Sequence, residues 1–176
     1  MHGTYETIDG GPAIRFERRL AHPVEKVWRA VTDPDELANW FPAKVAFDAL
    51  KVGGRLDFTF PDEELPPGTG EITDLDPPRV FAFDWDGFED GTDHLRFELE
   101  PAGEEGCLLR FTHILTASNR ASRDTAGWHV CLDRLEKSLG GSDTEMPTSD
   151  PTDEWRELYD EYRRRGLPAG AEIPSG

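Results

Sequence analysis

Hydrophobic and polar residues alternate along most of the chain between residues 13 and 115, which is typical of β-strands. In AIRFERRLA (13–21), Ile14 and Phe16 alternate with charged neighbours, so one face of the strand is apolar and the other charged. The same alternation predicts six further strands, in KVAFDAL (44–50), GGRLDFTF (53–60), GTGEITDLDPP (68–78), RVFAFDWDG (79–87), DHLRFELEP (93–101) and CLLRFTHIL (107–115). Short connections rich in turn-forming residues favour antiparallel neighbours.

Other segments have apolar residues three and four positions apart, which predicts helices. Two short helices are expected after the first strand, one over 24–31 and one that Asp33 caps. A long helix is expected over 123–139, where the apolar stripe consists of Trp128, Cys131, Leu132, Leu135 and Leu139. The tail predicts another helix, capped by Asp150 with Pro151 in its first turn, whose stripe is Trp155, Leu158, Tyr159 and Tyr162. Because a lone helix of this length is marginal in water, this stripe should pack on the domain or on a partner.

This order of elements predicts an α+β fold, in which a long amphipathic helix covers the apolar face of a twisted antiparallel sheet. If the sheet curves around the helix, a cavity can form between them. The expected organisation is an N-terminal segment over 1–12, one domain over 13–141, a linker over 142–151 and a tail helix with the chain end over 152–176.

Composition narrows the classes of function. The chain has 36 acidic and 19 basic residues and a net charge of −17, which repels nucleic acids and anionic lipid surfaces. No apolar run approaches the roughly 18 residues that span a membrane, and the first residues lack the pattern of a signal peptide. The two cysteines fit a reducing compartment. We therefore expect a soluble cytoplasmic protein with no nucleic-acid or membrane partner.

Several motifs resemble those of a known superfamily. They are FERRLAHPVEKVWRAVTDPDELANWF, KVGGRLDF, GEITDLDPPRVFAFDW, LRFTHIL and GWHVCLDRLEKSL, which occur in this order between residues 13 and 140. The chain resembles the START-type, birch-pollen-allergen-like (SRPBCC) superfamily, and within it the family homologous to the C-terminal domain of the activator of the heat-shock-protein-90 ATPase. The resemblance implies a helix-grip fold, in which a curved antiparallel sheet of about six or seven strands wraps around the long helix. The tail helix is similar to an extension on stand-alone bacterial members.

The superfamily includes lipid carriers, polyketide cyclases or aromatases, and co-chaperone domains, so the resemblance leaves function open. The favoured hypothesis is a binder of a small hydrophobic or aromatic molecule that carries out no catalysis and needs no cofactor. Its predicted ligand-binding residues are Trp40, Phe41, Phe58, Phe60, Phe83, Trp85, Phe97, Phe111, His113, Trp128, Cys131 and Leu132.

Two alternatives stay open. A cyclase- or aromatase-like enzyme could fold a polyketide-type substrate, with His113 and either Arg15 or Arg18 polarising a carbonyl group. An interaction module could use the acidic surface and the tail helix for homodimer or chaperone contact. The co-chaperone has an additional N-terminal domain for which this chain has no room, so an activator role is not expected.

The remaining chemistry-bearing residues predict little. His129 lies about 100° around the helix from Trp128 and is expected at the pocket edge or the surface. Cys131 is expected to be an inert buried thiol. No metal site is expected, because His129 and Cys131 diverge on the helix. The acidic stretch DWDGFEDGTD (84–93) is expected to be a solvated hairpin, because its glycine is misplaced for a calcium loop.

Overall fold

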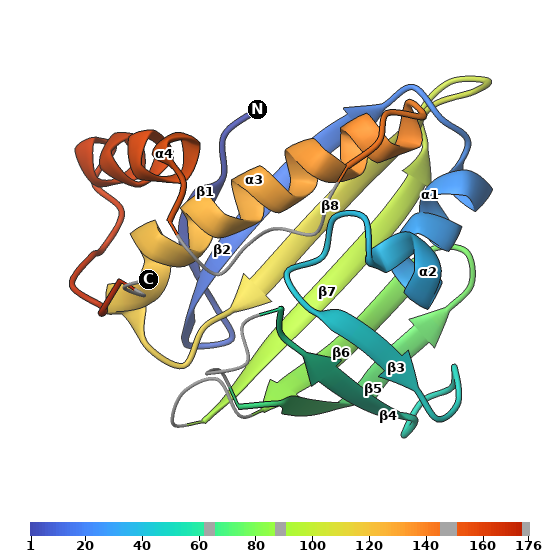
Figure 1. The fold of residues 1–176 in the computed structure, drawn as a ribbon, viewed down its shortest axis with the longest axis horizontal. Coiled ribbons are helices and arrows are strands. Elements are labelled where there is room, and N and C mark those ends of the chain that lie inside the picture. The colour runs from blue at the N-terminus through green and yellow to red at the C-terminus, as the bar shows by residue number, and fades with distance from the viewer. Residues whose placement is uncertain (62–65, 87–90, 145–150, 174–176) are drawn as a thin grey trace.

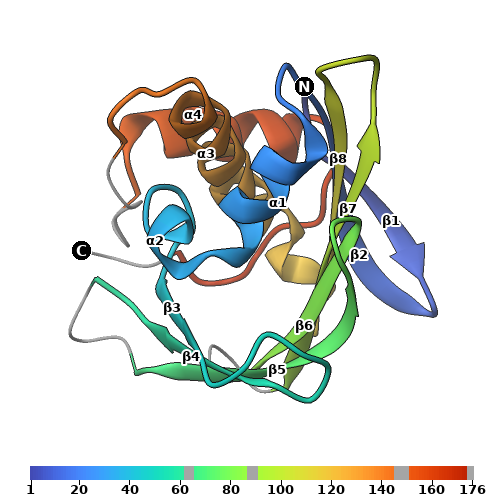
Figure 2. The ribbon, with the colours of Figure 1, turned by 90° about the vertical axis from the view of Figure 1, so that its right-hand side faces the viewer.

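A computed structural model describes residues 1–61, 66–86, 91–144 and 151–173 of the chain. These residues form an eight-stranded antiparallel sheet with the strand order β1-β2-β8-β7-β6-β5-β4-β3. The strands are β1 (Thr4–Ile8), β2 (Gly11–Leu20), β3 (Lys44–Phe47), β4 (Arg55–Thr59), β5 (Gly68–Asp76), β6 (Val80–Asp86), β7 (Thr92–Pro101) and β8 (Cys107–Ile114). The sheet is a curved layer with the helices on its concave side (Figure 1 and Figure 2). The α+β helix-grip fold expected from the sequence is therefore confirmed.

Seven of these strands correspond to predicted ones, and the eighth comes from the N-terminal segment. β1 pairs with β2 through a tight turn at Asp9 and Gly10, both of which have positive φ angles. The sequence TYETI has no strong apolar pattern, and its residues are exposed or half-buried in the structure. This segment forms a strand because it pairs with β2, and its own side chains predict the strand poorly.

The short helices α1 (Val24–Thr32) and α2 (Pro34–Leu37) follow β2, as expected. The Asp33 carboxylate accepts a hydrogen bond from the Asp35 backbone N–H at 2.9 Å, which caps α2 as predicted. Trp40 follows α2, and its indole N–H donates to the Ala30 carbonyl at 2.8 Å. This bond fixes α2 against α1, and together they cover the β3–β6 part of the sheet (Figure 2).

The long helix α3 (Ala121–Leu139) follows the single 3₁₀ turn η1 (Ser118–Arg120) and crosses the concave face of the sheet (Figure 1). Its predicted apolar stripe is fully buried. Ala121, Ser122, Thr125 and Ala126 extend the buried surface to the first turns. The helix therefore begins two residues earlier than the pattern indicates, because small residues there pack as closely as the larger apolar ones.

The tail helix α4 (Asp153–Arg164) packs on α3 (Figure 1). Its capping residue is Thr152, whose hydroxyl accepts from the Trp155 N–H at 3.2 Å. The expected cap, Asp150, lies outside the described residues, and Pro151 precedes the helix. Beyond α4, the Ser122 N–H and hydroxyl donate to the carbonyls of Pro168 and Leu167, so the chain end is attached to the start of α3.

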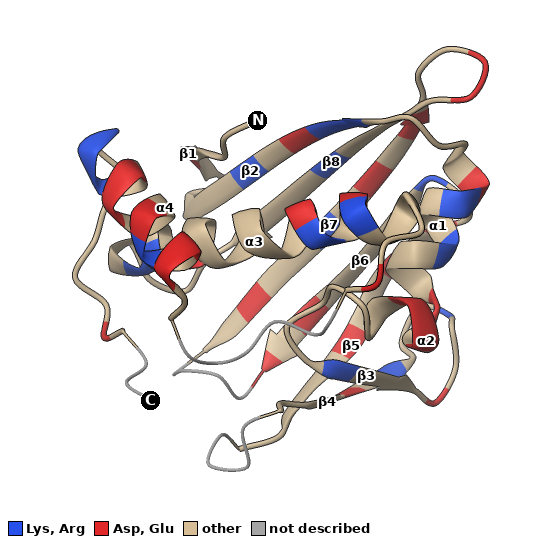
Figure 3. Ribbon diagram, turned by 45° about the horizontal axis from the view of Figure 1, so that its top comes forward, with Lys and Arg blue, Asp and Glu red and all other residues tan. Residues whose placement is uncertain are grey.

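The convex face of the sheet is charged and paired across strands. Arg110 contacts Glu17 on β2 and Glu100 on β7, and Arg96 of β7 contacts Asp74 on β5. Acidic and basic residues accordingly alternate over the same strands in Figure 3. The residues of these cross-strand pairs occupy the charged, outward positions of the alternating pattern that predicted the strands. Within the described part of the chain, no helix is both long and apolar enough to cross a bilayer.

Candidate aromatic interior and its buried polar network

The predicted ligand-binding residues converge on the space between the concave face of the sheet and the helices. Eleven of them are buried there: Trp40, Phe41, Phe58, Phe83, Trp85, Phe97, Phe111, His113, Trp128, Cys131 and Leu132. The twelfth, Phe60, is half-buried and stacks on Trp85 at a centroid distance of 6.1 Å. The inward positions therefore lie where the alternation placed them. Whether they bind a ligand stays a prediction.

The rings contact one another across the interior. Phe58 stacks on Trp85 with centroids 4.6 Å apart, and Phe41 lies 5.5 Å from the same indole. At the α3 side, Phe111 lies 4.5 Å from Trp128 and 4.8 Å from Phe97. Offset and edge contacts at these distances are favourable. We call this continuous set of rings the aromatic interior.

A small cavity lies beside these rings. A cavity of about 10 Å³ lies inside the β3–β7 part of the sheet, close to the volume that one water molecule needs. Its lining residues are Val31, Leu37, Phe41, Val45, Phe47, Leu56, Phe58, Phe81, Phe83 and Phe97. They come from α1, α2, the loop after α2, and the sheet, and none comes from α3. This cavity therefore lies under the short helices α1 and α2.

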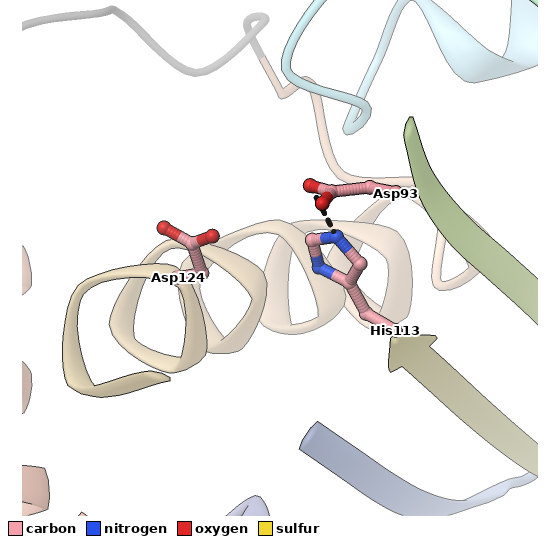
Figure 4. Close-up of side chains that lie close together, drawn as sticks. All are labelled: Asp93, His113 and Asp124. Atoms are coloured by element: carbon pink, nitrogen blue, oxygen red, sulfur yellow. Dashed lines mark hydrogen bonds and ion pairs between the residues drawn. The ribbon is translucent and has the colours of Figure 1, made fainter. Parts of the chain in front are cut away.

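His113 is a buried polar residue near the end of β8, beside the aromatic interior. Figure 4 shows its ring pointing toward Asp93 at the start of β7, and Nε2 lies 2.9 Å from Asp93 Oδ2. On the other side, the indole N–H of Trp128 donates to Nδ1 at 2.9 Å. An indole can only donate, so Nδ1 must be unprotonated and Nε2 must carry the proton. Both ring nitrogens of a neutral His113 are thereby occupied.

Asp93 is the acceptor that connects this histidine to the start of α3. Its carboxylate also accepts from the Arg120 guanidinium at 2.6 and 3.0 Å and from the Thr116 N–H at 3.0 Å. Burial raises the pKa of this carboxyl, but the hydrogen bonds from His113 and Arg120 and the positive charge of Arg120 outweigh it and hold the pKa well below its ordinary value. Asp93 is therefore ionised. The expectation that 84–93 is wholly solvated is wrong for this residue, and 87–90 lie outside the described residues.

Asp93, His113 and Asp124 place potential metal-ligating atoms within 4.8 Å of one another (Figure 4). The guanidinium of Arg120 already lies between the two carboxylates, 2.6 Å from Asp93 and 2.8 Å from Asp124. A metal ion would have to displace this buried cation and also break the bond between His113 and Asp93. The arrangement is thus a buried ion-pair network, in which Arg120 supplies the positive charge.

The two cysteines are buried free thiols. Burial raises the pKa of Cys131 to about 12 and that of Cys107 to about 11, so neither is a thiolate at neutral pH. The prediction that Cys131 is an inert buried thiol agrees with this environment.

The two arginines considered for catalysis lie away from His113. Arg15 pairs with Glu6 of β1 on the opposite face of the sheet, because its neighbours Ile14 and Phe16 point inward. Arg18 is on the inner face, but its guanidinium contacts Asp133 near the middle of α3 at 3.0 Å. Neither can act with His113 on one carbonyl group in this arrangement.

His129 is buried, so the expectation of a position at the pocket edge or surface is wrong. Its Nδ1 lies 2.7 Å from the Tyr162 hydroxyl of α4. Helix periodicity correctly predicted that His129 lies on a different side of α3 from Trp128. However, α4 covers this side of α3, and the contact depends on a helix 33 residues further along the chain.

Comparison with known proteins identifies similar folds. The family model described as "Activator of Hsp90 ATPase homolog 1-like protein" matches residues 21–140. The crystal structure of CalU16 from Micromonospora echinospora is 26% identical, with a TM-score of 0.69 over 90% of this chain and 89% of that one. Protein EF2215 from Enterococcus faecalis, of unknown function, is 23% identical, with a TM-score of 0.72 over 93% and 89%.

A further solved structure is DynU16, a protein of the dynemicin biosynthetic locus. It is 23% identical, with a TM-score of 0.65 over 76% of this chain and 49% of that one. Comparison with curated protein sequences gives no match.

Proposed function

Because the chain belongs to the family of Activator of Hsp90 ATPase homolog 1-like proteins, we propose that it binds a small, predominantly apolar aromatic molecule in its aromatic interior and carries out no catalysis. The observation that carries this proposal is the continuous set of inward-facing rings from α3, the loop after α2 and strands β4, β6, β7 and β8. A cytoplasmic location and the absence of a cofactor belong to the same proposal.

The ligand would enlarge the cavity described above by displacing its lining side chains. This cavity of about 10 Å³ is far below the roughly 300 Å³ of a typical ligand pocket. Phe47 lines this cavity and is only half-buried, so it is the part of the wall closest to solvent. We propose entry between α2 and β3, with the rings of Phe41 and Phe58 moving apart.

The polar groups of the interior restrict the ligand. Nδ1 of His113 accepts a hydrogen bond from the indole N–H of Trp128, and Nε2 donates one to Asp93. A ligand that needed hydrogen bonds at this depth would have to break that network, which costs about 1–3 kcal/mol for each group left without a partner. The preferred ligand is therefore apolar at its buried end.

Native mass spectrometry of freshly purified protein tests the proposal by searching for co-purified small molecules. A second measurement titrates an amphiphilic aromatic probe, 1-anilinonaphthalene-8-sulfonate, by fluorescence. Phe58→Ala should enlarge the cavity and tighten probe binding by about tenfold, although it should lower the free energy of unfolding by about 3–5 kcal/mol. Phe60→Ala, at the half-buried end of the ring stack, is the matched control. Equal probe binding by both variants and the wild type would contradict an interior site.

A cyclase-like enzyme is the second candidate, because DynU16 comes from a biosynthetic locus. Its assigned acid–base residue is His113, whose ring nitrogens are both occupied. Retained turnover of candidate substrates by His113→Ala would remove this role.

A self-association module stays a third possibility. Tyr162 of α4 is buried against His129 of α3, and Trp155 lies near Gly127, so part of the apolar stripe of α4 is already covered by α3. Native mass measurement with and without residues 142–176 distinguishes a monomer from a homodimer.

A further inference from the structure

Four elements that are far apart in the sequence meet at His129. The N-terminal residues, β2 and α4 all contact α3 at this point, on the side of the helix away from Trp128. Tyr162 of α4 is completely buried here, and its hydroxyl lies between His129 and the backbone of Gly3.

The hydrogen bonds at this junction have a defined direction. The Gly3 N–H donates to the Tyr162 oxygen at 2.9 Å. The Tyr162 O–H can then donate to His129 Nδ1 at 2.7 Å, provided that Nδ1 carries no proton. The proton of a neutral His129 lies on Nε2, which faces Asp133 at 3.5 Å. Only the neutral ring can accept the tyrosine proton. Protonation of His129 reverses this hydrogen bond, because Nδ1–H then donates to the Tyr162 oxygen and the buried Tyr162 hydroxyl proton loses its acceptor.

Charged groups from every neighbouring element surround this ring. The N-terminal segment contributes the Met1 amino group and His2, whose ring centroid is 5.3 Å from that of His129. β2 contributes Arg18, and α3 contributes Asp133, which is already paired with Arg18. α4 contributes Tyr162 and, one residue before it, Glu161, which pairs with His2 at 3.0 Å and with Arg165. A cation at His129 would thus face three other positive groups and one shared carboxylate.

The junction also covers one end of the aromatic interior. Gly3 lies so close to Phe16 that a Cβ atom there would come within 2.6 Å of its ring. Phe16 in turn lies 6.5 Å from Phe111, which belongs to the aromatic interior. Detachment of α4 and the N-terminal residues would therefore expose the Phe16 end of the interior to solvent.

We propose that His129 is a pH-sensitive latch, which holds α4 and the N-terminal residues over the Phe16 end of the interior while it is neutral and releases them when it is protonated. The latch operates without a ligand, so it stands independently of the binding function proposed above.

The direction of the pH dependence follows from burial. Burial lowers the pKa of His129 from 6.5 to about 4 in the docked state, and Arg18, His2 and the Met1 amino group lower it too, against the opposing effect of Asp133. The detached state has the ordinary value of about 6.5 and binds the proton more strongly. Docking is therefore fully favoured above pH 6.5. It weakens by up to tenfold per pH unit as the pH falls toward 4.

Hydrogen–deuterium exchange of the full-length protein between pH 7.5 and 5, corrected for the intrinsic exchange rate, tests the latch. We expect the protection of α4 amides to fall by about 10- to 30-fold over this range while β7 and β8 stay protected. His129→Gln keeps an oxygen acceptor for Tyr162 but does not titrate, so its α4 protection should stay constant with pH. His22→Gln, the same substitution in the turn before α1, should behave as the wild type.

Tyr162→Phe provides a second variant if His129→Gln disturbs the fold. Removal of one buried hydroxyl should lower α4 protection by about fivefold already at pH 7.5. The latch is refuted if α4 protection does not change with pH in the wild type, if it changes equally in His129→Gln, or if the central strands lose protection together with α4.

Discussion

At the residue scale, a tryptophan on another element selects the tautomer of the His113 ring. Trp128 of α3 donates to Nδ1, and Asp93 of β7 accepts from Nε2. This arrangement resembles a carboxylate–histidine pair of a catalytic site, but the third position is a donor in place of a nucleophile. A general base needs a ring nitrogen that can take a proton from substrate. In this structure both ring nitrogens of His113 are occupied, and their hydrogen bonds join β8 to β7 and α3.

Trp128→Phe tests this role of His113. The substitution keeps an aromatic ring but removes the N–H that fixes the histidine tautomer. We expect a loss of about 1–3 kcal/mol in the free energy of unfolding, because a buried acceptor loses its donor. The ¹⁵N chemical shifts of His113 should also change from a single Nε2–H tautomer to a mixture. Trp28→Phe, on the half-buried face of α1, is the matched control. An unchanged tautomer in Trp128→Phe would show that Asp93 alone orients the ring.

At the scale of elements, α3 packs against the sheet on one face and against α4 on another. The predicted leucine stripe packs against the sheet, and the opposite face carries His129 and Gly127 under α4. Gly127 lies in the helix interior, where glycine is unfavourable. A Cβ atom there would lie 3.8 Å from the Trp155 indole nitrogen, which is an ordinary contact distance. The close packing of α4 therefore does not require glycine at this position.

Gly127→Ala should consequently stabilise the protein by about 0.5–1 kcal/mol, measured by urea denaturation. Gly70→Ala in β5 is the opposite case, because its Cβ atom would collide with the Asp84 carbonyl of the adjacent strand. This second variant should be destabilised. A destabilised Gly127→Ala would mean that α4 packs more tightly on α3 than the 3.8 Å separation indicates.

At the scale of the whole molecule, acidic residues outnumber basic ones, although many charged side chains form ion pairs. Cross-strand ion pairs cover the convex face of the sheet, yet the net charge of the chain is −17. Exposed pairs each contribute only about 0–1 kcal/mol, whereas uniform negative charge opposes compaction. Self-repulsion should therefore dominate the response of the whole molecule to salt.

The thermal midpoint at pH 7.5 should rise as sodium chloride is increased from 20 to 300 mM, because salt screens this repulsion. Near pH 5, close to the isoelectric point of about 4.6, the rise should disappear. Differential scanning calorimetry at both pH values provides the measurement. A midpoint that falls with salt at pH 7.5 would instead assign the larger effect to the ion pairs.

The sequence predicted the parts of this architecture that depend on local patterns. Alternation identified seven strands and the inward positions of the aromatic residues, and helical spacing identified α1, α3 and α4. It did not predict β1, which depends on pairing with β2, or the burial of Asp93. Asp93 lies in an acidic stretch that reads as solvated, and its burial requires His113 and Arg120, residues 20 and 27 positions away.

The sequence by itself determined the fold class and which side chains point inward, because periods of 2 and 3.6 residues fix the face on which each residue lies. Only the tertiary structure decided the volume left between those side chains and the partners of the histidines. Packing density depends on how rings from separate elements interlock, and hydrogen bonds depend on distances set by the whole sheet. The sequence placed His113 on an inward strand face and His129 at the pocket edge or the surface, but only the tertiary contacts join His113 to Asp93 and Trp128 and His129 to Tyr162.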